Sequence, residues 1–266
     1  MKKTVKILVS ALCAAAMCGS LVSLGGCGND KERITVSGSS SVTPLMEKLA
    51  AQYEKNHDVR ITVNMSSSGA GISDTLNGLN DIGMVSRELD ESETGLTPTT
   101  LCMDGIALIV GKGCAVDNVS KADVKALFEK GTAIPDTTIT SGIGRDASSG
   151  TRKAFDELLE IKNGYAATNS TLAETGNVIE AIQGTVNSLG YISFGSLKNT
   201  VKAVSLDGIA CTVENIINNT YALQRPFIIV VKQNAELSSA AQGFYDYIVS
   251  AEAQSVITGE GYISVK

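Results

Sequence analysis

The alternation of short β-branched segments with helical periods constrains the fold of this chain more than any other feature. From Arg33 onward, residues 34–36 predict a strand, a serine-rich turn follows, and residues 44–56 predict a helix. Residues 59–63 begin the same cycle again. Such alternation indicates an α/β fold with largely parallel sheets that are flanked by helices. Because about 235 residues of this pattern exceed what one sheet usually needs, we expect two lobes.

Local signals set the expected boundaries of these elements. Thr43 is expected to cap the first helix, with Pro44 at its first position. Further strands are expected over residues 81–85, 106–110, 138–140, 191–194, 201–204 and 227–231, and further helices over residues 72–79, 121–130, 151–161, 178–185 and 238–249. No repeat of the length typical of solenoid proteins is present, so the unit that recurs is a strand followed by a helix.

The first 26 residues have the build of an export signal. Three lysines precede an apolar run over residues 7–22 that is too short, and too rich in Ala and Ser, to span a membrane comfortably. Residues 24–27 end in Cys27 and resemble the lipobox of bacterial lipoproteins, whose cysteine is acylated and becomes the new N-terminus. We therefore expect a signal peptide over residues 1–26, an acylated Cys27 and a polar tether over residues 27–32. Ordinary cleavage beside an incidental cysteine is the alternative.

The net charge excludes some classes of partner. The chain has 22 Lys and Arg against 28 Asp and Glu, which is a net charge of −6. Removal of the expected signal peptide with its three lysines leaves 19 against 28, a net charge of −9. Nucleic acid and anionic membrane surfaces are therefore not expected partners, because binding to them depends on clustered Lys and Arg.

Three cysteines remain after the expected signal peptide and the expected lipid anchor are set aside: Cys102, Cys114 and Cys211. An odd number allows at most one disulfide, and the spacing of these residues does not resemble a zinc site. Buried free thiols are the favoured interpretation, and a disulfide between two of the three is left open.

The turns that follow the predicted strands are rich in hydroxyls and glycines. Glycine lets the backbone approach a ligand closely, and Ser or Thr supplies O–H donors without bulk or charge. In open α/β sheets, ligands bind outside the carboxyl ends of the strands, where helices begin. The turns therefore indicate a cradle for an oxyanion, although each turn alone could be a plain helix cap. They cover residues 38–41, 66–69, 86–87 and 148–152.

The hypothesis that this protein is an enzyme has little support in the sequence. His57 is the only histidine and lies in a polar segment, where a solvated loop residue is the expected interpretation. The motifs of serine hydrolases, nucleotide-binding loops and dinucleotide folds are absent, and the acids are scattered without metal-ligand spacing. We expect no enzyme activity, no cofactor and no metal.

At these turns the sequence closely resembles the phosphate-binding subunit of bacterial ABC phosphate importers. The resemblance runs from Ile34 to about Tyr262, and its most specific part is the Arg-x-x-x-Ser-Gly-Thr pattern that starts at Arg145. Supporting segments lie in the expected order along the chain, at residues 37–44, 68–72, 81–87, 104–107, 190–193 and 225–227.

The resemblance implies a set of phosphate-binding residues. Arg145 would be the buried cation, and the other groups would donate from hydroxyls or from backbone N–H groups. The expected set is Ser40, Ser41, Ser68, Ser86, Arg87, Arg145, Ser149, Gly150 and Thr151. Well-known family members have an Asp where this chain has Ser86, so the basis for rejecting sulfate is open. Asp146 is either a substitute acceptor or a residue that orients Arg145.

The resemblance also implies the architecture and the partners. The expected fold is the two-lobed periplasmic-binding-protein-like fold of type II, with mostly parallel sheets and two crossover hinges near residues 103–104 and 225–226. Lobe 1 would comprise residues 33–104 and 226–266, and lobe 2 residues 105–225. The expected protein is an extracytoplasmic monomer of a Gram-positive bacterium, held at the outer face of the cell membrane by acylated Cys27. It would deliver inorganic phosphate to the permease subunits of an ABC transporter.

Two other functions stay open at this point. The same fold could bind sulfate or another tetrahedral oxyanion, which the replacement of the family's Asp by Ser86 permits. A secreted phosphatase that uses one of the serines is a more remote alternative.

Overall fold

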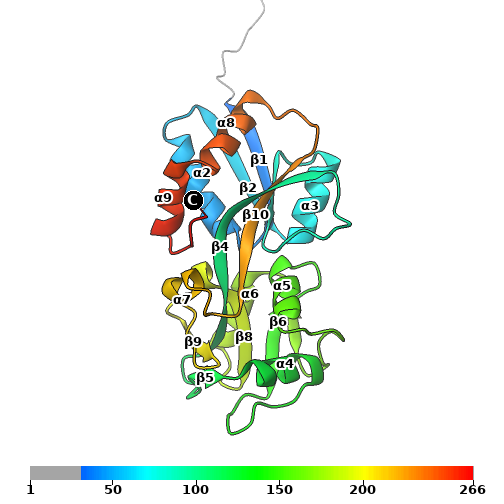
Figure 1. Cartoon of the computed structure of the whole chain (residues 1–266), viewed down its shortest axis with the longest axis vertical. Coiled ribbons are helices and arrows are strands. Elements are labelled where there is room, and N and C mark those ends of the chain that lie inside the picture. The colour runs from blue at the N-terminus through cyan, green and yellow to red at the C-terminus, as the bar shows by residue number, and fades with distance from the viewer. Residues whose placement is uncertain (1–30, 266) are drawn as a thin grey trace, which may run out of the picture. The chain divides into compact units, whose positions relative to one another are not determined.

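Two neighbouring antiparallel strands, β4 (Leu96–Gly111) and β10 (Gln224–Lys232), connect the two halves of the molecule (Figure 1). The structure is a computed structural model that describes residues 31–265, and the described chain from Glu32 onward is one folded unit. Its strands follow one continuous order: β2 (Val59–Ser66), β1 (Glu32–Ser39), β3 (Ile82–Val85), β10, β4, β8 (Ser188–Ser193), β6 (Ser141–Arg145) and β7 (Ser170–Leu172). We call the half at the β2 end lobe 1 and the half at the β7 end lobe 2.

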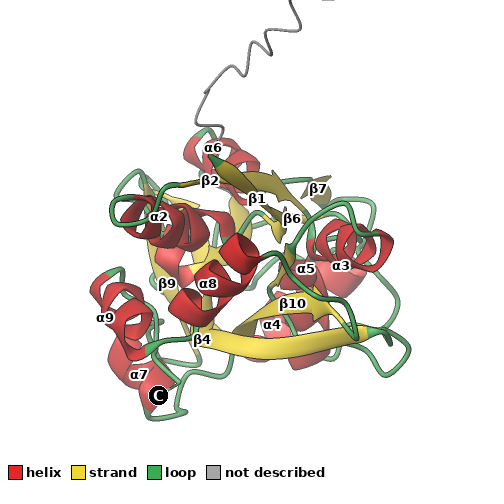
Figure 2. Cartoon of the chain, turned by 90° about the horizontal axis from the view of Figure 1, so that it is seen from above, coloured by secondary structure: helices red, strands yellow, loops and turns green. Residues whose placement is uncertain are grey.

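Lobe 1 is a small sheet between helices. Its strands are β1 (Glu32–Ser39), β2 (Val59–Ser66) and β3 (Ile82–Val85), and its helices are α2 (Thr43–Glu54), α3 (Ser68–Asn77), α8 (Ser239–Ile248) and α9 (Ala251–Gly259). Figure 2 looks down on this lobe and shows α2 and α8 next to each other, with α3 away from both. The buried side chains of β1 face α2 and α8 and form one apolar core, which includes Ile34, Val36 and Phe244.

Lobe 2 repeats this construction with different elements. Its strands are β5 (Asn118–Val119), β6 (Ser141–Arg145), β7 (Ser170–Leu172), β8 (Ser188–Ser193) and β9 (Val201–Leu206). Its helices are α4 (Lys121–Lys130), α5 (Gly150–Leu158), α6 (Thr175–Gln183) and α7 (Val213–Ile217), with a short 3-10 turn at Phe194–Ser196. A second apolar core, centred on Phe128, Phe155 and Tyr191, lies beneath them.

The two-lobed α/β fold expected from the sequence is present. Parallel pairing holds among β1, β2 and β3 and among β6, β7 and β8. Pairing is antiparallel wherever β4 or β10 takes part, so the sheet is more mixed than expected. The reason is that the chain crosses between the lobes twice, in opposite directions, along two adjacent strands.

A buried ion pair joins the two crossover strands. Asp104 of β4 lies opposite Arg225 of β10, and Arg225 Nη2 donates to Asp104 Oδ2 at 3.0 Å. The two side chains are 0% and 2% exposed. Burial raises the pKa of Asp104 to about 6, although the Arg225 charge opposes that rise. The pair lies where the family resemblance implies the two crossovers, and the residue-level lobe boundaries stay a prediction.

Several predicted elements have different bounds in the structure. The cap expected at Thr43 is wrong: Val42 occupies the N-cap position without a side-chain cap, and Thr43 is the first helical residue. The Thr43 hydroxyl donates to the Ser39 carbonyl at 3.1 Å. The strand expected over residues 138–140 is wrong, and β6 begins at Ser141. The strand expected over residues 106–110 is the second part of the longer β4, and the helix α9 was not expected.

The N-terminal predictions fall outside the described residues. These are the signal peptide over residues 1–26, the acylated Cys27 and most of the tether over residues 27–32. Among residues 31–265, no helix has the length and apolar character needed to cross a membrane. Cys102, Cys114 and Cys211 are buried free thiols, which confirms the favoured interpretation of these three residues.

Candidate anion-binding site

The hydroxyl-rich turns of the two lobes meet in one buried cluster. Lobe 1 contributes the turn after β1, the start of α3 and the residue that follows β3, while lobe 2 contributes the starts of α5 and α6. Each of these segments lies at the carboxyl end of a strand or at the N-terminus of a helix, where unpaired N–H groups face outward. The clustered side chains are all at most 3% exposed: Ser40, Ser41, Ser68, Ser86, Arg145, Thr151 and Thr175.

Hydroxyl groups bridge the two lobes directly. Ser41 Oγ lies 2.8 Å from Thr151 Oγ1 and 3.1 Å from Thr175 Oγ1. Ser86 Oγ lies 3.4 Å from Thr151 Oγ1 and 3.2 Å from Ser68 Oγ. A hydroxyl can both donate and accept, and it can rotate its proton toward a new acceptor. The cluster therefore holds several O–H donors that can turn to a small oxyanion.

Arg145 is the cation of this cluster. It ends β6, and its Nη2 donates to Ser40 Oγ at 3.0 Å while its Nη1 donates to Thr175 Oγ1 at 3.0 Å. Its Nε and Nη2 also donate to the carbonyls of Leu172 and Ala173, at 3.3 and 2.6 Å. These neutral acceptors hold the guanidinium at the interface of the two lobes without a carboxylate in contact with it, although Asp146 and Glu174 act on its charge from farther away.

The electrostatic state of Arg145 follows from its neighbours. Burial lowers the pKa of Arg145, since removal from water disfavours the charged form. Within the described part of the chain, no carboxylate forms an ion pair with it. An arginine remains protonated despite such a shift. A buried positive charge without a carboxylate partner is suited to an anionic ligand.

The start of α5 approaches lobe 1 so closely that only glycine fits at Gly150. A Cβ atom there would lie 2.2 Å from Ser68 Oγ and 2.9 Å from Ser86 Oγ. Ser149 precedes it as the helix cap, and Ser149 Oγ accepts from Arg152 N at 3.3 Å, which leaves the Ser149 O–H proton able to donate. The positive end of α5 thus faces the lobe 1 serines.

Thr175 is a member of the cluster that sequence reasoning missed. It begins α6, and its Oγ1 contacts Ser40, Ser41 and Arg145. The predicted helix began only at Val178, because residues 175–177 are polar and carry no apolar period. The available signal was a threonine followed by a glycine before a helix, which matches the other turns of the cluster.

Two residues considered from the sequence lie elsewhere. The guanidinium of Arg87 binds the carboxylate of Glu93 and has no hydrogen bond to the cluster among the described contacts. Asp146 Oδ1 accepts from the Ser148 backbone N–H and hydroxyl, at 3.1 and 2.7 Å, so the carboxylate stabilises its own turn. The role of Arg87 as a ligand contact stays a prediction without support from its position.

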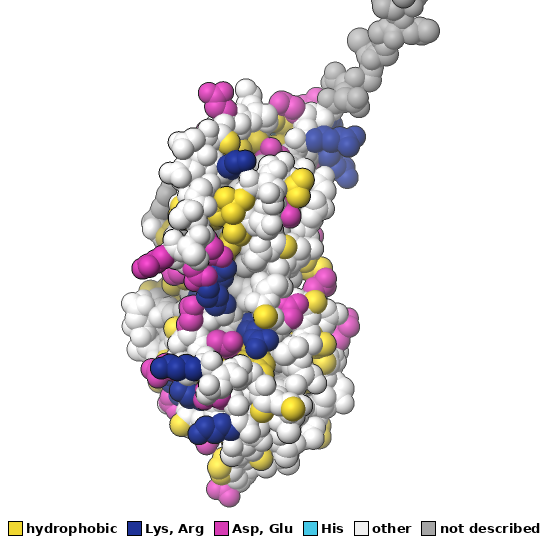
Figure 3. Space-filling view, turned by 90° about the vertical axis from the view of Figure 1, so that its right-hand side faces the viewer, with side chains coloured by type: hydrophobic (Ala, Val, Ile, Leu, Met, Phe, Trp, Pro, Cys, Tyr) yellow, Lys and Arg dark blue, Asp and Glu magenta, His cyan; other side chains and the backbone are white. Residues whose placement is uncertain are grey.

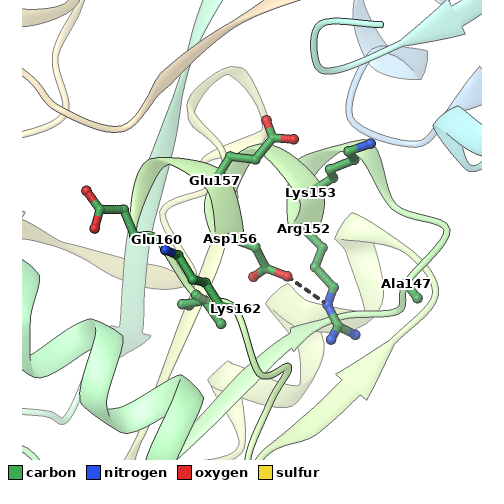
Figure 4. A pocket seen from close by; sticks show the side chains of 8 residues that line it. Ala147, Arg152, Lys153, Asp156, Glu157, Glu160 and Lys162 are labelled. Carbon is green, nitrogen blue, oxygen red and sulfur yellow. Dashed lines mark hydrogen bonds and ion pairs between the residues drawn. The ribbon is translucent and has the colours of Figure 1, made fainter. Parts of the chain in front are cut away.

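The backbone of Arg145 is held on both sides by a network in lobe 2. The Arg145 N–H donates to Tyr191 Oη at 3.1 Å, and Arg152 Nη1 donates to the Arg145 carbonyl at 3.1 Å. Arg152 also lies over the Tyr165 ring, 4.1 Å from its centroid, and pairs with Asp156. Figure 4 shows the Arg152–Asp156 pair in an open surface pocket beside α5. The pocket is therefore lined by the Arg152–Asp156 pair, and Arg152 in turn holds the Arg145 backbone carbonyl.

Comparison with known proteins supports this description of the fold. The sequence matches the PBP superfamily domain over residues 26–252. An ABC transporter substrate-binding protein from Clostridium perfringens, solved with bound phosphate, is similar with a TM-score of 0.83 and 34% identity, over 88% of this chain and 100% of that one. An ABC-type phosphate transport receptor from Vibrio cholerae has a TM-score of 0.70 and 31% identity, over 87% and 99% of the two chains.

A curated relative extends the comparison over nearly the whole sequence. The phosphate-binding protein PstS of Borreliella burgdorferi is 28% identical over 265 residues, which cover 91% of this chain and 94% of the relative. The mixed α/β fold with helices around the sheet agrees with these matches. The chain therefore belongs to the PBP superfamily, among the ABC-transporter substrate-binding proteins.

Proposed function

We propose that this protein captures inorganic phosphate between its two lobes and delivers it to an ABC transporter. The observation that carries this proposal is Arg145, a buried cation without a carboxylate partner among the described residues, surrounded by hydroxyls from both lobes. Relatives that align over most of this chain are phosphate-binding proteins, and one similar structure contains phosphate. Geometry and relationship thus support the same ligand.

The proposed mechanism is closure of the lobes around the anion. Lobe 1 offers hydroxyls from Ser40, Ser41, Ser68 and Ser86, and lobe 2 offers Arg145 with the start of α5. Only the closed arrangement presents both sets of donors to one ion, so the anion stabilises that arrangement. The closed shape is then what the transporter recognises.

The proposed ligand contacts are the residues expected from the sequence, except Arg87, with one addition. Ser149, Gly150 and Thr151 would donate from the N-terminus of α5, where the first backbone N–H groups have no partner inside the helix. Thr175 is added because its hydroxyl joins the Arg145 guanidinium to the lobe 1 serines. A tetrahedral oxyanion can accept several such bonds at once, which compensates for the loss of its hydration.

We further propose how the protein reaches the transporter. Residues 24–27 support acylation at Cys27, which would hold a monomer at the outer face of the cell membrane of a Gram-positive bacterium. Its permease partners would then lie in the same membrane. Binding rather than catalysis is the proposed activity, because the cluster contains no carboxylate or imidazole within the described residues that could act as a general base.

Calorimetric titration of the mature protein with phosphate and with sulfate tests the function. We expect phosphate to bind more tightly than sulfate. Hydrogen phosphate carries a proton that a carboxylate could accept, whereas fully ionised sulfate carries none. The described cluster has no such carboxylate, so sulfate is the relevant competitor. Equal affinity for the two anions would show that the site binds tetrahedral oxyanions in general instead of phosphate specifically. No heat with either anion would contradict the proposal. Release of phosphate from an ester by the purified protein would show a phosphatase instead.

A further inference from the structure

Arg87 is buried, but its guanidinium binds residues of the loop that follows β3 and not those of the anion cluster. Its Nη1 and Nη2 donate to the two carboxylate oxygens of Glu93 at 2.7 and 2.6 Å, and its Nη1 also donates to the Glu88 carbonyl at 2.7 Å. The hydrogen bonds from Arg87 lower the pKa of Glu93, and Glu93 in turn raises the pKa of Arg87. A bidentate pair of this kind fixes the relative orientation of both side chains.

This pair shapes the loop between β3 and β4. Glu93 Oε2 accepts from the Asp90 backbone N–H at 2.8 Å, and the Glu93 N–H donates to the Asp90 carbonyl at 2.9 Å. Residues 88–93 therefore fold around the Arg87 guanidinium. The fold of the loop directs the Asp90 side chain outward, where its Oδ2 forms an ion pair with Lys153 Nζ.

The ion pair between Asp90 and Lys153 connects the two lobes beside the anion cluster. Asp90 belongs to lobe 1, and Lys153 lies on α5 of lobe 2, two residues after Thr151. Figure 4 shows Lys153 extending from α5 away from Asp156. A second contact lies nearby, because the Gly69 N–H of lobe 1 donates to the Ser148 carbonyl of lobe 2 at 3.3 Å.

The charges around this ion pair alternate between the lobes. Lys153 of lobe 2 lowers the pKa of Glu93 in lobe 1, and Glu157 of lobe 2 raises the pKa of Arg87 in lobe 1. Figure 3 shows Lys and Arg side chains together with Asp and Glu side chains at mid-height of this face. Opposite charges therefore attract one another across the lobe boundary, most directly at the Asp90–Lys153 ion pair, and these attractions weaken as the lobes separate.

We infer that Arg87, Glu93, Asp90 and Lys153 form an interlobe latch that increases affinity for the anion without touching it. The inference rests on the proposed binding of phosphate. A ligand that needs the closed state binds with an apparent Kd that rises as the closed fraction falls, so any contact made only on closure tightens binding. Arg87 and Glu93 shape the loop in lobe 1. Asp90 of that loop then forms the ion pair with Lys153 of lobe 2.

The exposure of the ion pair limits its effect. The Lys153 and Asp90 side chains are 34% and 40% exposed. Exposed pairs are weak and are screened by salt, so loss of the latch should raise the Kd for phosphate by about two- to fivefold at low ionic strength and by less at high ionic strength. A residue with only a structural role would not show this dependence on salt.

The test compares the phosphate Kd of the mature protein and its variants at about 20 mM and about 500 mM NaCl, which span strong and weak electrostatic interaction. The single changes are Asp90→Asn and Lys153→Met, the charge exchange combines Asp90→Lys with Lys153→Asp, and the matched control is Glu91→Gln, an exposed acid one residue away. We expect each single change to raise Kd by about two- to fivefold at low salt only. The exchange should restore only part of the affinity, because it also places a carboxylate at position 153 near Glu93 and an ammonium at position 90 near Arg87. The control should match the unmodified protein.

The outcomes separate the latch from the proposed function. Single variants that bind as tightly as the unmodified protein at low salt would overturn the latch, as would a charge exchange that restores nothing. Equal losses at both salt concentrations would also overturn it, since they would indicate a packing effect. If the unmodified protein itself fails to bind phosphate, the proposed function fails instead.

Discussion

Arg145 and Arg87 are both buried arginines at the carboxyl end of a strand, but their guanidinium groups have different kinds of partner. Arg145 is 2% exposed and binds hydroxyls and carbonyls, and burial lowers its pKa. Arg87 is 6% exposed and binds the carboxylate of Glu93, which raises its pKa. Burial is therefore a poor guide to function, and the charge of the partner distinguishes the two residues.

The difference has a simple physical origin. A guanidinium that already faces a carboxylate is electrically compensated, and an arriving anion would have to displace that carboxylate. A guanidinium that faces neutral oxygens keeps its charge available and is stabilised when an anion arrives. The protein thus contains one arginine prepared for a ligand and one that organises a loop.

Replacement of Arg145 should have the largest effect. Arg145→Met removes the buried charge that has no carboxylate in contact with it, and we expect the Kd for phosphate to rise at least about 100-fold, which corresponds to a loss of about 3 kcal/mol. Arg145→Lys should recover only part of this loss, because an ammonium lacks the fork of donors that reaches two acceptors. Calorimetric titration measures both variants. Wild-type affinity in Arg145→Met would show that the anion binds elsewhere.

Removal of the Thr175 hydroxyl should have an intermediate effect. Thr175→Val keeps the shape but removes the acceptor of Arg145 Nη1, and we expect Kd to rise about 10-fold, since hydrogen bonds to charged groups contribute about 1.5 kcal/mol or more. Thr175→Ser keeps the hydroxyl and is the matched control. If the Val and Ser variants bind equally well, the hydroxyl does not position the guanidinium.

Replacement of Arg87 should affect stability more than binding. Arg87→Met leaves the Glu93 carboxylate without its partner, so we expect the free energy of unfolding to fall by about 2 kcal/mol. The Kd for phosphate should rise by about fivefold or less, through loss of the latch. Denaturant unfolding and titration of the same sample separate the two effects. A loss of affinity as large as that of Arg145→Met would place Arg87 among the ligand contacts.

The dependence of stability on pH should show the smallest effect. Arg87 holds the pKa of Glu93 below its ordinary value of 4.5, so between the two pKa values the unfolded chain binds more protons than the folded protein. Stability from this pair is therefore fully present above pH 4.5 and is lost as pH falls through the lowered pKa. The difference in unfolding free energy between wild type and Glu93→Gln should shrink on acidification. A difference that does not change with pH would contradict the pairing.

Much of the fold could be predicted from local patterns. The strands around Ile34, Ile61 and Ile228 and the helices around Leu49 and Phe155 are present where apolar periodicity indicates them. The predictions failed where pairing with a distant strand, and not the local apolar period, sets the bounds of an element. The strand expected over residues 138–140 begins at Ser141 instead, because Ser141 pairs with Ser188 of β8, a partner distant in sequence.

The candidate site was predictable to the extent that its turns were. Serine and glycine at the carboxyl ends of strands are a local signal, and Ser40 and Ser68 lie in the cluster as that signal indicates. Arg145, also in the cluster, was expected only from the family resemblance. Thr175 was missed because its segment carries no periodicity. The partner of Arg87 was missed because Glu93, six residues later, reaches the guanidinium only when the loop folds back.

The sequence by itself therefore determined the α/β construction, the order of its elements and the set of polar turns, because these follow from periodicity and turn chemistry within short segments. The tertiary structure alone decided which buried arginine has no carboxylate in contact with it, how β4 and β10 pair, and which charges meet across the lobes. Those properties depend on the distances between groups far apart in the chain, and electrostatic interactions and hydrogen bonds act over only a few ångströms.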